Sequence, residues 1–259
     1  MSTLSVSVVQ SELHWHDPAR NLEHFSTILQ QLKQETHLVV LPEMFSTGFT
    51  MHAEGHAERM DGRSVTWMSE TAQALTAAVC GSLIIEEGGR YFNRFLLMHP
   101  DGDLQYYDQR HLFRLAGEHE HYAAGTDNRT FTLRGWRIRP MICYDLRFPA
   151  WSRNRGDYDL LVYVANWPDA RHQAWETLLR ARAIENLAYV AGVNRIGTDG
   201  NGLRYAGGSA IIDYLGNYLA APGDRPEVST ASLDLSALTT FRRKFPFHVD
   251  ADEFSLQRG

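Results

Sequence analysis

Cysteine is scarce in this chain of 259 residues, which contains only Cys80 and Cys143. Two thiols cannot form the set of disulfides that staples a small secreted domain. The count alone allows one bridge between them, but we expect both cysteines to be reduced. Long apolar runs are also missing, and no stretch reaches the roughly 18 residues of a membrane-spanning helix. The first residues enter a strand pattern directly, without a basic or cleavable apolar segment, so we expect a cytoplasmic protein with no membrane partner.

Lysine is the second scarce residue, although 25 residues are basic and 31 are acidic, which gives a net charge of −6. It occurs only at Lys33 and Lys244. No basic stripe is present, so we expect no nucleic-acid partner. The twelve histidines include no histidine–cysteine set with the spacing of a closed zinc site, and we expect no metal. The paired histidines fall in predicted loops, where we expect solvated or locally hydrogen-bonded side chains: His14/His16, His52/His56 and His119/His121.

The first third of the chain predicts a parallel strand pair. Residues 4–10 alternate and then run apolar, which indicates a strand. Asp17 and Pro18 predict a helix start, with Asp17 as the N-cap and Pro18 in the first turn. Residues 37–41 predict a second, buried strand that ends at a proline. A strand–helix–strand unit of this length implies a parallel pair joined by a crossover helix.

The rest of the chain predicts further buried strands and one more long helix. Between 79 and 107, three strands separated by glycine- and proline-containing turns are antiparallel in character. Residues 136–142 and 160–164 predict strands, and 172–186 predict a helix. We therefore expect one α/β domain over 1–259, with two mixed sheets packed face to face and helices outside. Burial of both sheets explains the nearly continuous apolar runs.

The segment from about 236 is rich in aromatic residues, which are costly to leave in water. We expect it to pack on the body of the protein or on a second subunit, and we expect a homodimer. The aromatic residues of this segment are Phe241, Phe245, Phe247 and Phe254.

Cys143 is the candidate nucleophile. It directly follows the predicted strand 136–142 and begins a polar turn. A strand that ends in cysteine holds the sulfur at the sheet edge, with the next backbone N–H groups beside it, where a nucleophile and anion-binding donors are needed. The alternative is a small apolar core residue, because buried cysteine is common.

Glu43 is the candidate base. It follows a buried strand and Pro42, so it is either a helix-capping acid or a functional acid at a sheet edge, and its position favours neither. A glutamate can act as general base on a thiol when burial raises its pKa towards neutrality.

Several motifs in order resemble the nitrilase, or carbon–nitrogen hydrolase, superfamily over nearly the whole chain, and in detail its ω-amidase branch. Each motif alone is weak, but three in order at suitable spacing are specific. This resemblance implies an α-β-β-α sandwich and a Glu–Lys–Cys site without a cofactor. The three motifs are Leu41-Pro42-Glu43, Gln109-Arg110-His111-Leu112-Phe113 and Cys143-Tyr144-Asp145-Leu146-Arg147-Phe148-Pro149.

The resemblance also implies roles. Glu43 would be the general base and Cys143 the nucleophile, which forms a thioester as ammonia leaves. The Tyr144 backbone N–H would help to stabilise the oxyanion. Glu118 resembles the second, supporting glutamate of the family, with Glu120 as the alternative. The alternative is that Glu118 and Glu120 have no function and are two loop acids in a histidine-rich surface.

The departure from the family is at Gln109, where the family has its catalytic lysine. Glutamine can donate a hydrogen bond but carries no charge, and charged donors make stronger hydrogen bonds. Lys33 and Lys244 are not obvious replacements, and Arg110 would point to the opposite face of an extended segment. Two origins stay open: a deliberate replacement of lysine, which the intact remaining motifs favour, or a naturally less active protein.

Arg147 is the candidate for substrate specificity, because a guanidinium four residues after the nucleophile could hold a carboxylate by two hydrogen bonds. A structural ion pair with Asp145 or Asp169 is an equal alternative. Five apolar residues could form a wall for a short carbon chain, and at least half of them should be core residues: Met44, Phe45, Tyr122, Trp167 and Trp175. Of these we expect Phe45, Tyr122 and Trp167 to contact the substrate.

The resemblance points to a small-molecule amide substrate, a short dicarboxylate monoamide such as 2-oxoglutaramate. The expected products are 2-oxoglutarate and ammonia, formed slowly because of Gln109. An N-carbamoyl amidase, a nitrilase and a ligand-binding pseudoenzyme are the alternatives.

Overall fold

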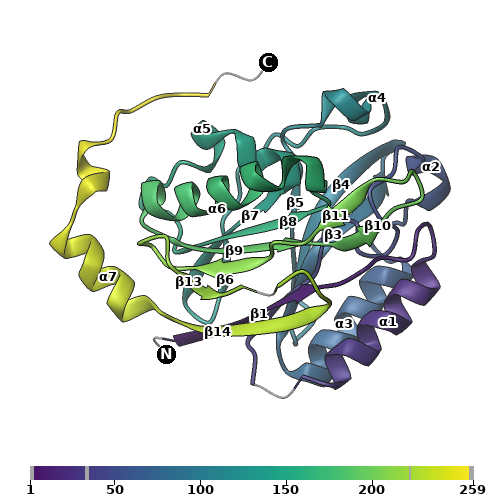
Figure 1. The fold of residues 1–259 in the computed structure, drawn as a ribbon, viewed down its shortest axis with the longest axis horizontal. Helices are drawn as coiled ribbons and strands as arrows, with labels where there is room; N and C mark the ends of the chain where they lie inside the picture. Colours follow the sequence, from purple (N-terminus) through teal and green to yellow (C-terminus); the bar gives the residue numbers. More distant parts are fainter. Residues whose placement is uncertain (1–2, 33–34, 222, 257–259) are drawn as a thin grey trace.

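Two six-stranded sheets face each other, and helices cover their outer faces (Figure 1). The computed structural model describes residues 3–32, 35–221 and 223–256. The two sheets meet through contacts of β1 with β9 and of β4 with β7. The predicted α-β-β-α sandwich of two mixed sheets is therefore confirmed.

The first sheet has the order β14-β1-β2-β3-β4-β5. The strands β1, β2 and β3 are parallel, whereas β14 pairs antiparallel with β1 and the β3-β4-β5 meander is antiparallel. The parallel pair and the later hairpins were both expected from the sequence. The bounds are β14 (Glu227–Asp234), β1 (Thr3–Gln10), β2 (Leu38–Val40), β3 (Ala78–Glu87), β4 (Arg90–Met98) and β5 (Leu104–Asp108).

The second sheet has the order β13-β12-β9-β8-β7-β6, and its centre β7-β8-β9 is also parallel. Its central strands are buried along their full length because the other sheet covers one face and helices cover the other. The bounds are β13 (Tyr218–Ala220), β12 (Ala210–Ile212), β9 (Tyr189–Asn194), β8 (Leu160–Ala165), β7 (Trp136–Ile142) and β6 (Phe131–Leu133). A separate hairpin of β10 (Ile196–Thr198) and β11 (Arg204–Ala206) was not predicted.

The longer helices lie on opposite sides of the molecule. Helices α1 (Pro18–Gln30) and α3 (Arg63–Leu75) lie side by side on the first sheet, and α6 (His172–Asn186) lies on the second. The predicted start of α1 is confirmed, since the Asp17 side chain accepts a hydrogen bond from the Arg20 N–H. Helix α3 ends at Leu75, because the next residue, Thr76, takes a left-handed φ of 52°.

The remaining helical pieces are short and connect the main elements. They are α2 (Ala53–His56), η1 (Arg114–Ala116), α4 (Glu118–His121), η2 (Cys143–Arg147), α5 (Pro149–Ser152), η3 (Asp169–Arg171) and η4 (Phe247–Asp250).

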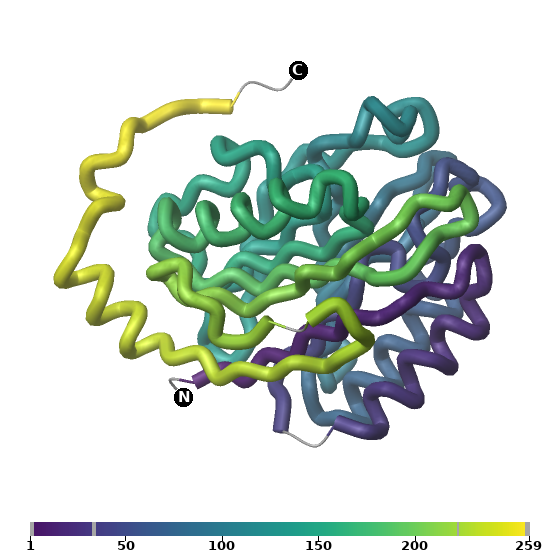
Figure 2. Tube along the Cα trace, viewed as in Figure 1, coloured from purple at the N-terminus to yellow at the C-terminus, as the bar shows by residue number. Residues whose placement is uncertain are grey.

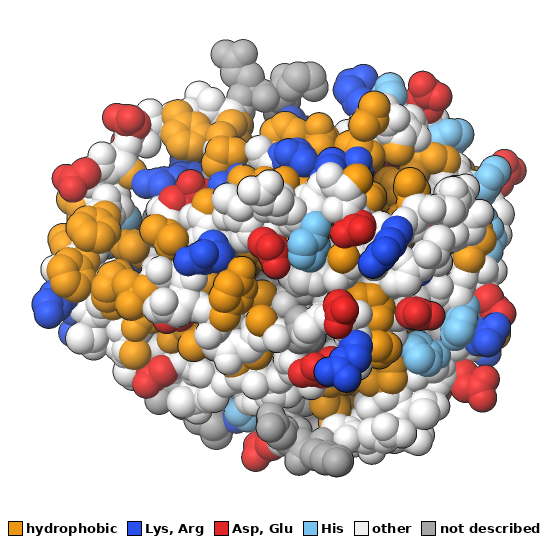
Figure 3. Space-filling view, viewed as in Figure 1, with side chains coloured by type: hydrophobic (Ala, Val, Ile, Leu, Met, Phe, Trp, Pro, Cys, Tyr) orange, Lys and Arg blue, Asp and Glu red, His pale blue; other side chains and the backbone are white. Residues whose placement is uncertain are grey.

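The C-terminal segment begins as helix α7 (Leu235–Lys244), which the sequence patterns did not reveal. The missed signal is Asp234, whose side chain caps the helix by accepting from two backbone N–H groups. Helix α7 is anchored by Arg242, whose guanidinium donates to Asp159. Beyond it the chain leaves the body as an extended arm (Figure 2). Phe247 is 61% exposed, and hydrophobic side chains gather where this arm lies (Figure 3).

Candidate active site

Cys143 lies at the carboxyl end of β7, where the parallel core of the second sheet ends. Its φ of 36° is in the left-handed region, which a residue with a Cβ adopts only at a cost. The chain therefore turns sharply at the cysteine and continues as η2. The thiol interacts with the Glu43 carboxylate and the Asn166 backbone N–H, and both groups affect its pKa.

Glu43 reaches the same point from the first sheet, just beyond the carboxyl end of β2. Its side chain is fully buried. One carboxylate oxygen accepts from the Asn93 Nδ2 at 2.8 Å, and the other accepts from the Asn166 backbone N–H at 2.7 Å. Burial raises the pKa of Glu43 to about 7, although these hydrogen bonds oppose the shift. A carboxyl group with that pKa can take and return a proton near neutral pH.

Glu118 is the second buried carboxylate of the site. Its Oε2 accepts from the Phe113 backbone N–H at 2.5 Å, whereas its buried Oε1 has no hydrogen-bond partner among the described residues. Burial, followed by the charge of Glu43, raises the pKa of Glu118 to about 8. Glu120 is exposed and does not line the cavity at Cys143, so of the two sequence candidates only Glu118 faces this site.

Gln109 is buried beside these acids and lines the same cavity. Its amide is occupied by neutral partners: Nε2 donates to the His111 carbonyl at 2.9 Å, and Oε1 accepts from Asn93 at 3.0 Å. No cation contacts the two carboxylates among the described residues. Burial, followed by Glu43 and Glu118, therefore raises the pKa of the Cys143 thiol.

The lysines and Arg110 do not replace the missing charge. Lys33 lies outside the described residues, and Lys244 ends α7, far along the chain from the site elements. The Arg110 guanidinium donates to the Gly125 carbonyl and lies 5.4 Å from the Trp151 ring centroid, and Arg110 does not line the cavity.

Asp145 fixes the nucleophile turn, a role that sequence reasoning did not assign. Its buried carboxylate accepts from the Tyr107 hydroxyl at 2.8 Å, the His111 backbone N–H at 3.0 Å and the Ile142 backbone N–H at 3.1 Å. The His111 Nδ1 lies 2.8 Å from the same carboxylate. The turn at Cys143 and the loop that carries Gln109 are thus tied to one side chain.

We expect Asp145→Ala to destabilise the protein more than any substitution of an exposed acid. Each buried donor left without an acceptor costs about 1–3 kcal/mol, and at least two donors would be orphaned. Urea denaturation would measure the loss, with Asp169→Ala, a half-exposed acid that accepts no hydrogen bond from a buried backbone N–H in the described chain, as the control. An unchanged denaturation midpoint for Asp145→Ala would contradict this role.

The rim of the cavity carries Arg147 and Trp167, two of the residues that the sequence analysis considered. The Arg147 guanidinium carbon lies 4.9 Å from the Trp167 ring centroid. Neither ion pair considered for Arg147 forms: Asp145 is occupied as described, and the Asp169 carboxylate lies 3.6 Å from Arg204. Tyr144 also lines the cavity.

Phe45 and Tyr122 do not line this cavity, so their predicted place in its wall is wrong. Phe45 is fully buried in the core under α1 and α3, packed against Phe25 and Trp67. Tyr122 lies in a separate apolar cluster, and its hydroxyl donates to the Thr50 carbonyl. Met44 and Trp175 are also core residues. The apolar wall consists of Phe49, Phe113, Ala116, Trp167, Pro168, Leu203 and Tyr205.

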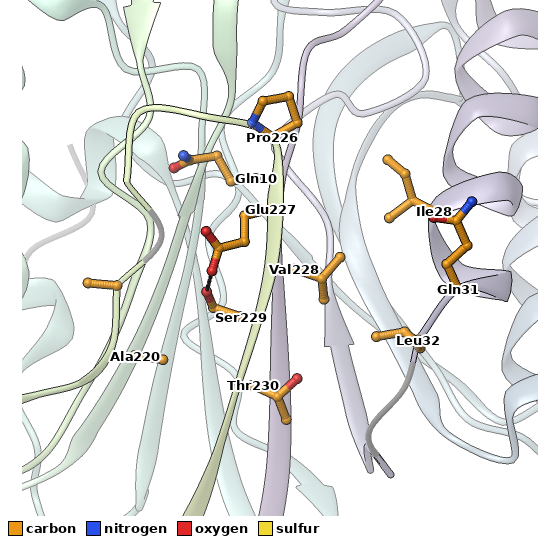
Figure 4. Close-up of a pocket in the computed structure, with 11 residues that line it drawn as sticks. Gln10, Ile28, Gln31, Leu32, Ala220, Pro226, Glu227, Val228, Ser229 and Thr230 are labelled. Carbon is orange, nitrogen blue, oxygen red and sulfur yellow. Dashed lines mark hydrogen bonds between the residues drawn. The ribbon is translucent and has the colours of Figure 1, made fainter.

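No other place in the described chain combines these groups. A wider groove flanks β14, but its described lining contains no cysteine, histidine or arginine, and its one acid, Glu227, accepts from Ser229 (Figure 4). Among residues 3–32, 35–221 and 223–256, no cluster of three or more histidines, cysteines or acids could hold a metal ion. Both cysteines are free thiols, as expected. No helix within the described ranges is long and apolar enough to cross a membrane.

The cavity therefore joins the Cys143 thiol and the buried Glu43 carboxylate, each beyond the end of a parallel strand, with a second buried carboxylate, Glu118, from the start of α4. Asn93 and Asn166 orient the base, and the sequence analysis assigned neither a role. Asn166 carried a signal, because it lies two residues after the predicted buried strand 160–164. This arrangement supports attack of sulfur on an acyl carbon, with one carboxyl group moving the proton.

Comparisons with known proteins agree with this geometry. The sequence profile described as carbon-nitrogen hydrolase matches residues 5–243. The chain is 48% identical to "Omega-amidase YafV" from Yersinia enterocolitica over 99% of this chain and 100% of that protein. It is 31% identical to "2-oxoglutaramate amidase" from Bacillus subtilis, over 95% of this chain and 96% of that one.

A solved structure matches with a TM-score of 0.96 and 48% identity, over 99% of this chain and 100% of the other. It is XC1258 from Xanthomonas campestris, described as a CN-hydrolase superfamily protein with an arsenic adduct in the active site.

Proposed function

The chain belongs to the carbon–nitrogen hydrolase family, and on that premise we propose that it is an ω-amidase acting on short dicarboxylate monoamides. The observation that carries the proposal is the contact between the Cys143 thiol and the buried Glu43 carboxylate in a cavity with a cationic rim. The names of two relatives, an ω-amidase and a 2-oxoglutaramate amidase, support 2-oxoglutaramate as the substrate.

In the proposed first half-reaction, Glu43 takes the thiol proton and the Cys143 sulfur attacks the amide carbon. The oxyanion forms beside the Tyr144 backbone N–H, which follows the nucleophile in the chain. Glu43 returns the proton to the nitrogen, the C–N bond breaks, and ammonia leaves an acyl group on sulfur as a thioester.

In the second half-reaction, Glu43 takes a proton from water, and the resulting hydroxide attacks the thioester carbon. The C–S bond breaks, the carboxylic acid leaves, and the proton returns to the Cys143 sulfur. Glu118 supports this cycle by facing the same cavity. In this cycle Cys143 supplies the nucleophile and Glu43 moves the protons, and no redox cofactor is needed because acyl transfer to water involves no change of oxidation state.

The cationic rim favours a substrate with an anionic far end. The cavity is small, about 70 Å³, which suits a short acyl chain. Its floor is acidic and buried, so a neutral amide fits there better than a second carboxylate does.

Ammonia release from a panel of substrates tests the proposal. We expect the protein to hydrolyse 2-oxoglutaramate and succinamate slowly, and an N-carbamoyl amino acid or a short nitrile more slowly still. The same panel should be run on Gln109→Lys, because its higher rate makes the preference measurable. A preference for the carbamoyl compound or the nitrile would overturn the ω-amidase assignment within the family.

A ligand-binding pseudoenzyme is the second candidate, and Gln109 is the observation that favours it. In that case the site would hold a monoamide without cleaving it. If Gln109→Lys folds normally but hydrolyses no ω-amide, the binding role replaces the enzymatic one.

We further propose that the protein forms one domain and is a homodimer, in which the arm beyond α7 packs on a second copy. Its exposed Phe247 and Val249 support this, because apolar side chains gain by burial. The arm touches its own body at Arg155, whose guanidinium lies 4.8 Å from the Phe254 ring centroid. A cytoplasmic location also stays a prediction.

A further inference from the structure

A second guanidinium shares the rim of the cavity with Arg147. Arg171, the last residue of η3, is half-buried and lines the same cavity. The two arginines follow different strands: Arg147 lies beyond β7 and Arg171 beyond β8. They are the only cationic residues among those that line the cavity.

Both guanidinium groups pack against aromatic rings, and neither is paired with a carboxylate among the described residues. The Arg171 guanidinium carbon lies 5.2 Å from the Phe113 ring centroid, as Arg147 lies over Trp167. Neither arginine forms an ion pair with a carboxylate in the part of the chain that the structure describes, and Asp169, beside Arg171, is close to Arg204 instead. Their N–H donors therefore stay available to an anion.

Trp167 links the two arginines. Its indole N–H donates to the Arg171 backbone carbonyl at 2.8 Å, while Arg147 lies over its ring. The indole thus fixes the position of η3 relative to the nucleophile turn. This pre-organisation lowers the entropy that would be lost when one anion binds both guanidinium groups.

Charge is separated along the cavity. Glu43 and Glu118 lie at the reacting end beside Cys143, and the arginines lie at the rim. A molecule with an amide at one end and a carboxylate at the other matches this polarity in one orientation only. Planar guanidinium groups suit that carboxylate, because each can donate two parallel hydrogen bonds.

We propose that Arg171 is a specificity-determining residue that, together with Arg147, binds the carboxylate at the non-reacting end of the substrate. This inference rests on the proposed ω-amidase function and adds a residue that selects the substrate. It also explains why the rim has two arginines, since a second guanidinium strengthens the binding of a carboxylate but gives no advantage with a neutral substrate.

The test compares glutaramate with pentanamide, which has the same carbon chain but a methyl group in place of the carboxylate. Both are measured in the Gln109→Lys protein and in its Arg171→Ala, Arg171→Lys and Arg204→Ala derivatives. Arg204 is the matched control, because it is exposed, contacts η3 through Asp169 and does not line the cavity.

We expect Arg171→Ala to raise KM for glutaramate about tenfold, the effect of losing one charge-assisted hydrogen bond, with a smaller change in kcat. The value of kcat/KM for pentanamide should change less than twofold. Arg171→Lys should recover part of the loss, and Arg204→Ala should match its parent with both substrates.

Equal losses on both amides would overturn the proposal, because they would mean that Arg171 only supports Phe113 and η3. No loss on either amide would overturn it as well. If Gln109→Lys hydrolyses neither amide, the proposed function fails instead, and calorimetry of glutaramate binding to Cys143→Ala then decides the role of Arg171. A tenfold higher Kd for glutaramate in the Arg171→Ala derivative of Cys143→Ala would support the proposal. An unchanged Kd would overturn it, and so would a Cys143→Ala protein that does not bind glutaramate.

Discussion

Gln109→Lys should raise the turnover of short ω-amides by about 10²–10³-fold, the usual effect of one charged or oxyanion-stabilising donor in an active site. Position 109 is buried and lines the same cavity as the two acids. Glu118 Oε1 is buried without a partner among the described residues, so an ammonium group there would find an unused acceptor. Steady-state ammonia release measures the effect.

The gain has an electrostatic cause. In the present chain, burial and the two nearby carboxylates raise the pKa of the Cys143 thiol, so the nucleophile stays protonated at neutral pH. A positive charge at 109 would favour the thiolate and both carboxylates. It would also supply the charged hydrogen-bond donor that the Gln109 amide, bonded to His111 and Asn93, does not provide.

The same substitution should change the pH dependence of activity. Glu43 must be ionised to act as a base, and its pKa is about 7 here, so activity of the present chain should rise as pH increases through 7. A lysine lowers this pKa, and the acidic limb of the pH–rate profile should therefore move to lower pH.

Stability should respond to pH with a definite sign. The folded pKa values of Glu43 and Glu118, about 7 and about 8, are above the ordinary value of 4.5, so the folded state binds protons more tightly than the unfolded state. These two groups therefore make the free energy of unfolding fall as pH rises from about 4.5 to 8. Gln109→Lys should reduce that fall, which urea denaturation at pH 5 and pH 8 would measure.

A matched control separates charge from shape. Gln109→Met fills similar space without a charge and should give no increase in turnover. If Gln109→Met were as active as Gln109→Lys, relief of the glutamine's hydrogen bonds rather than the charge would explain the gain. An unchanged pH–rate profile in an active Gln109→Lys would count against the electrostatic cause.

Cys143→Ala, made in the Gln109→Lys protein, should abolish hydrolysis, with a loss on the order of 10⁶ in kcat as for other enzymes that lose their nucleophile. Glu43→Gln should cost nearly as much, because the thiol then loses the carboxylate that takes its proton. The double variant should be little worse than either single one, since the two groups act as a unit.

Cys80→Ala is the matched control for this loss. Cys80 is the other free thiol and is buried in β3, in the hydrophobic core, so its removal should leave kcat within a few-fold. Mass spectrometry adds a direct readout: with a slow substrate, the acyl group should be found on the peptide that contains Cys143. Retained hydrolysis in Cys143→Ala, or acylation of Cys80 instead, would disprove the proposed mechanism.

The sequence by itself determined the strands, the main helices and the two residues at the centre of the site. Apolar periodicity is a local property, so β1, α1, β2 and the later hairpins could be predicted from short windows. Glu43 and Cys143 each follow a buried strand, which made them candidates, and the resemblance of the surrounding motifs to a known family supplied their roles. Helix α7 was missed because its N-cap, Asp234, lies at the end of a strand.

Only the tertiary structure decided which side chains face the cavity. Phe45 and Tyr122 lie close in sequence to Glu43 and Glu118, but they point into the core and into another cluster. The choice between Glu118 and Glu120 was decided in the same way, since the Glu118 side chain is buried at the site and the Glu120 side chain is exposed. A residue's position in the chain limits where its backbone runs, whereas the direction of its side chain depends on partners far away in sequence.

The same reason explains the residues that sequence reasoning did not assign. Asp145 binds Tyr107, which is 38 residues away, and Asn166 binds Glu43, which is 123 residues away. Arg171 reaches the rim only because β8 lies beside β7 in the second sheet. Hydrogen bonds over such separations leave no periodic pattern in the sequence, and they form only when the two sheets pack together.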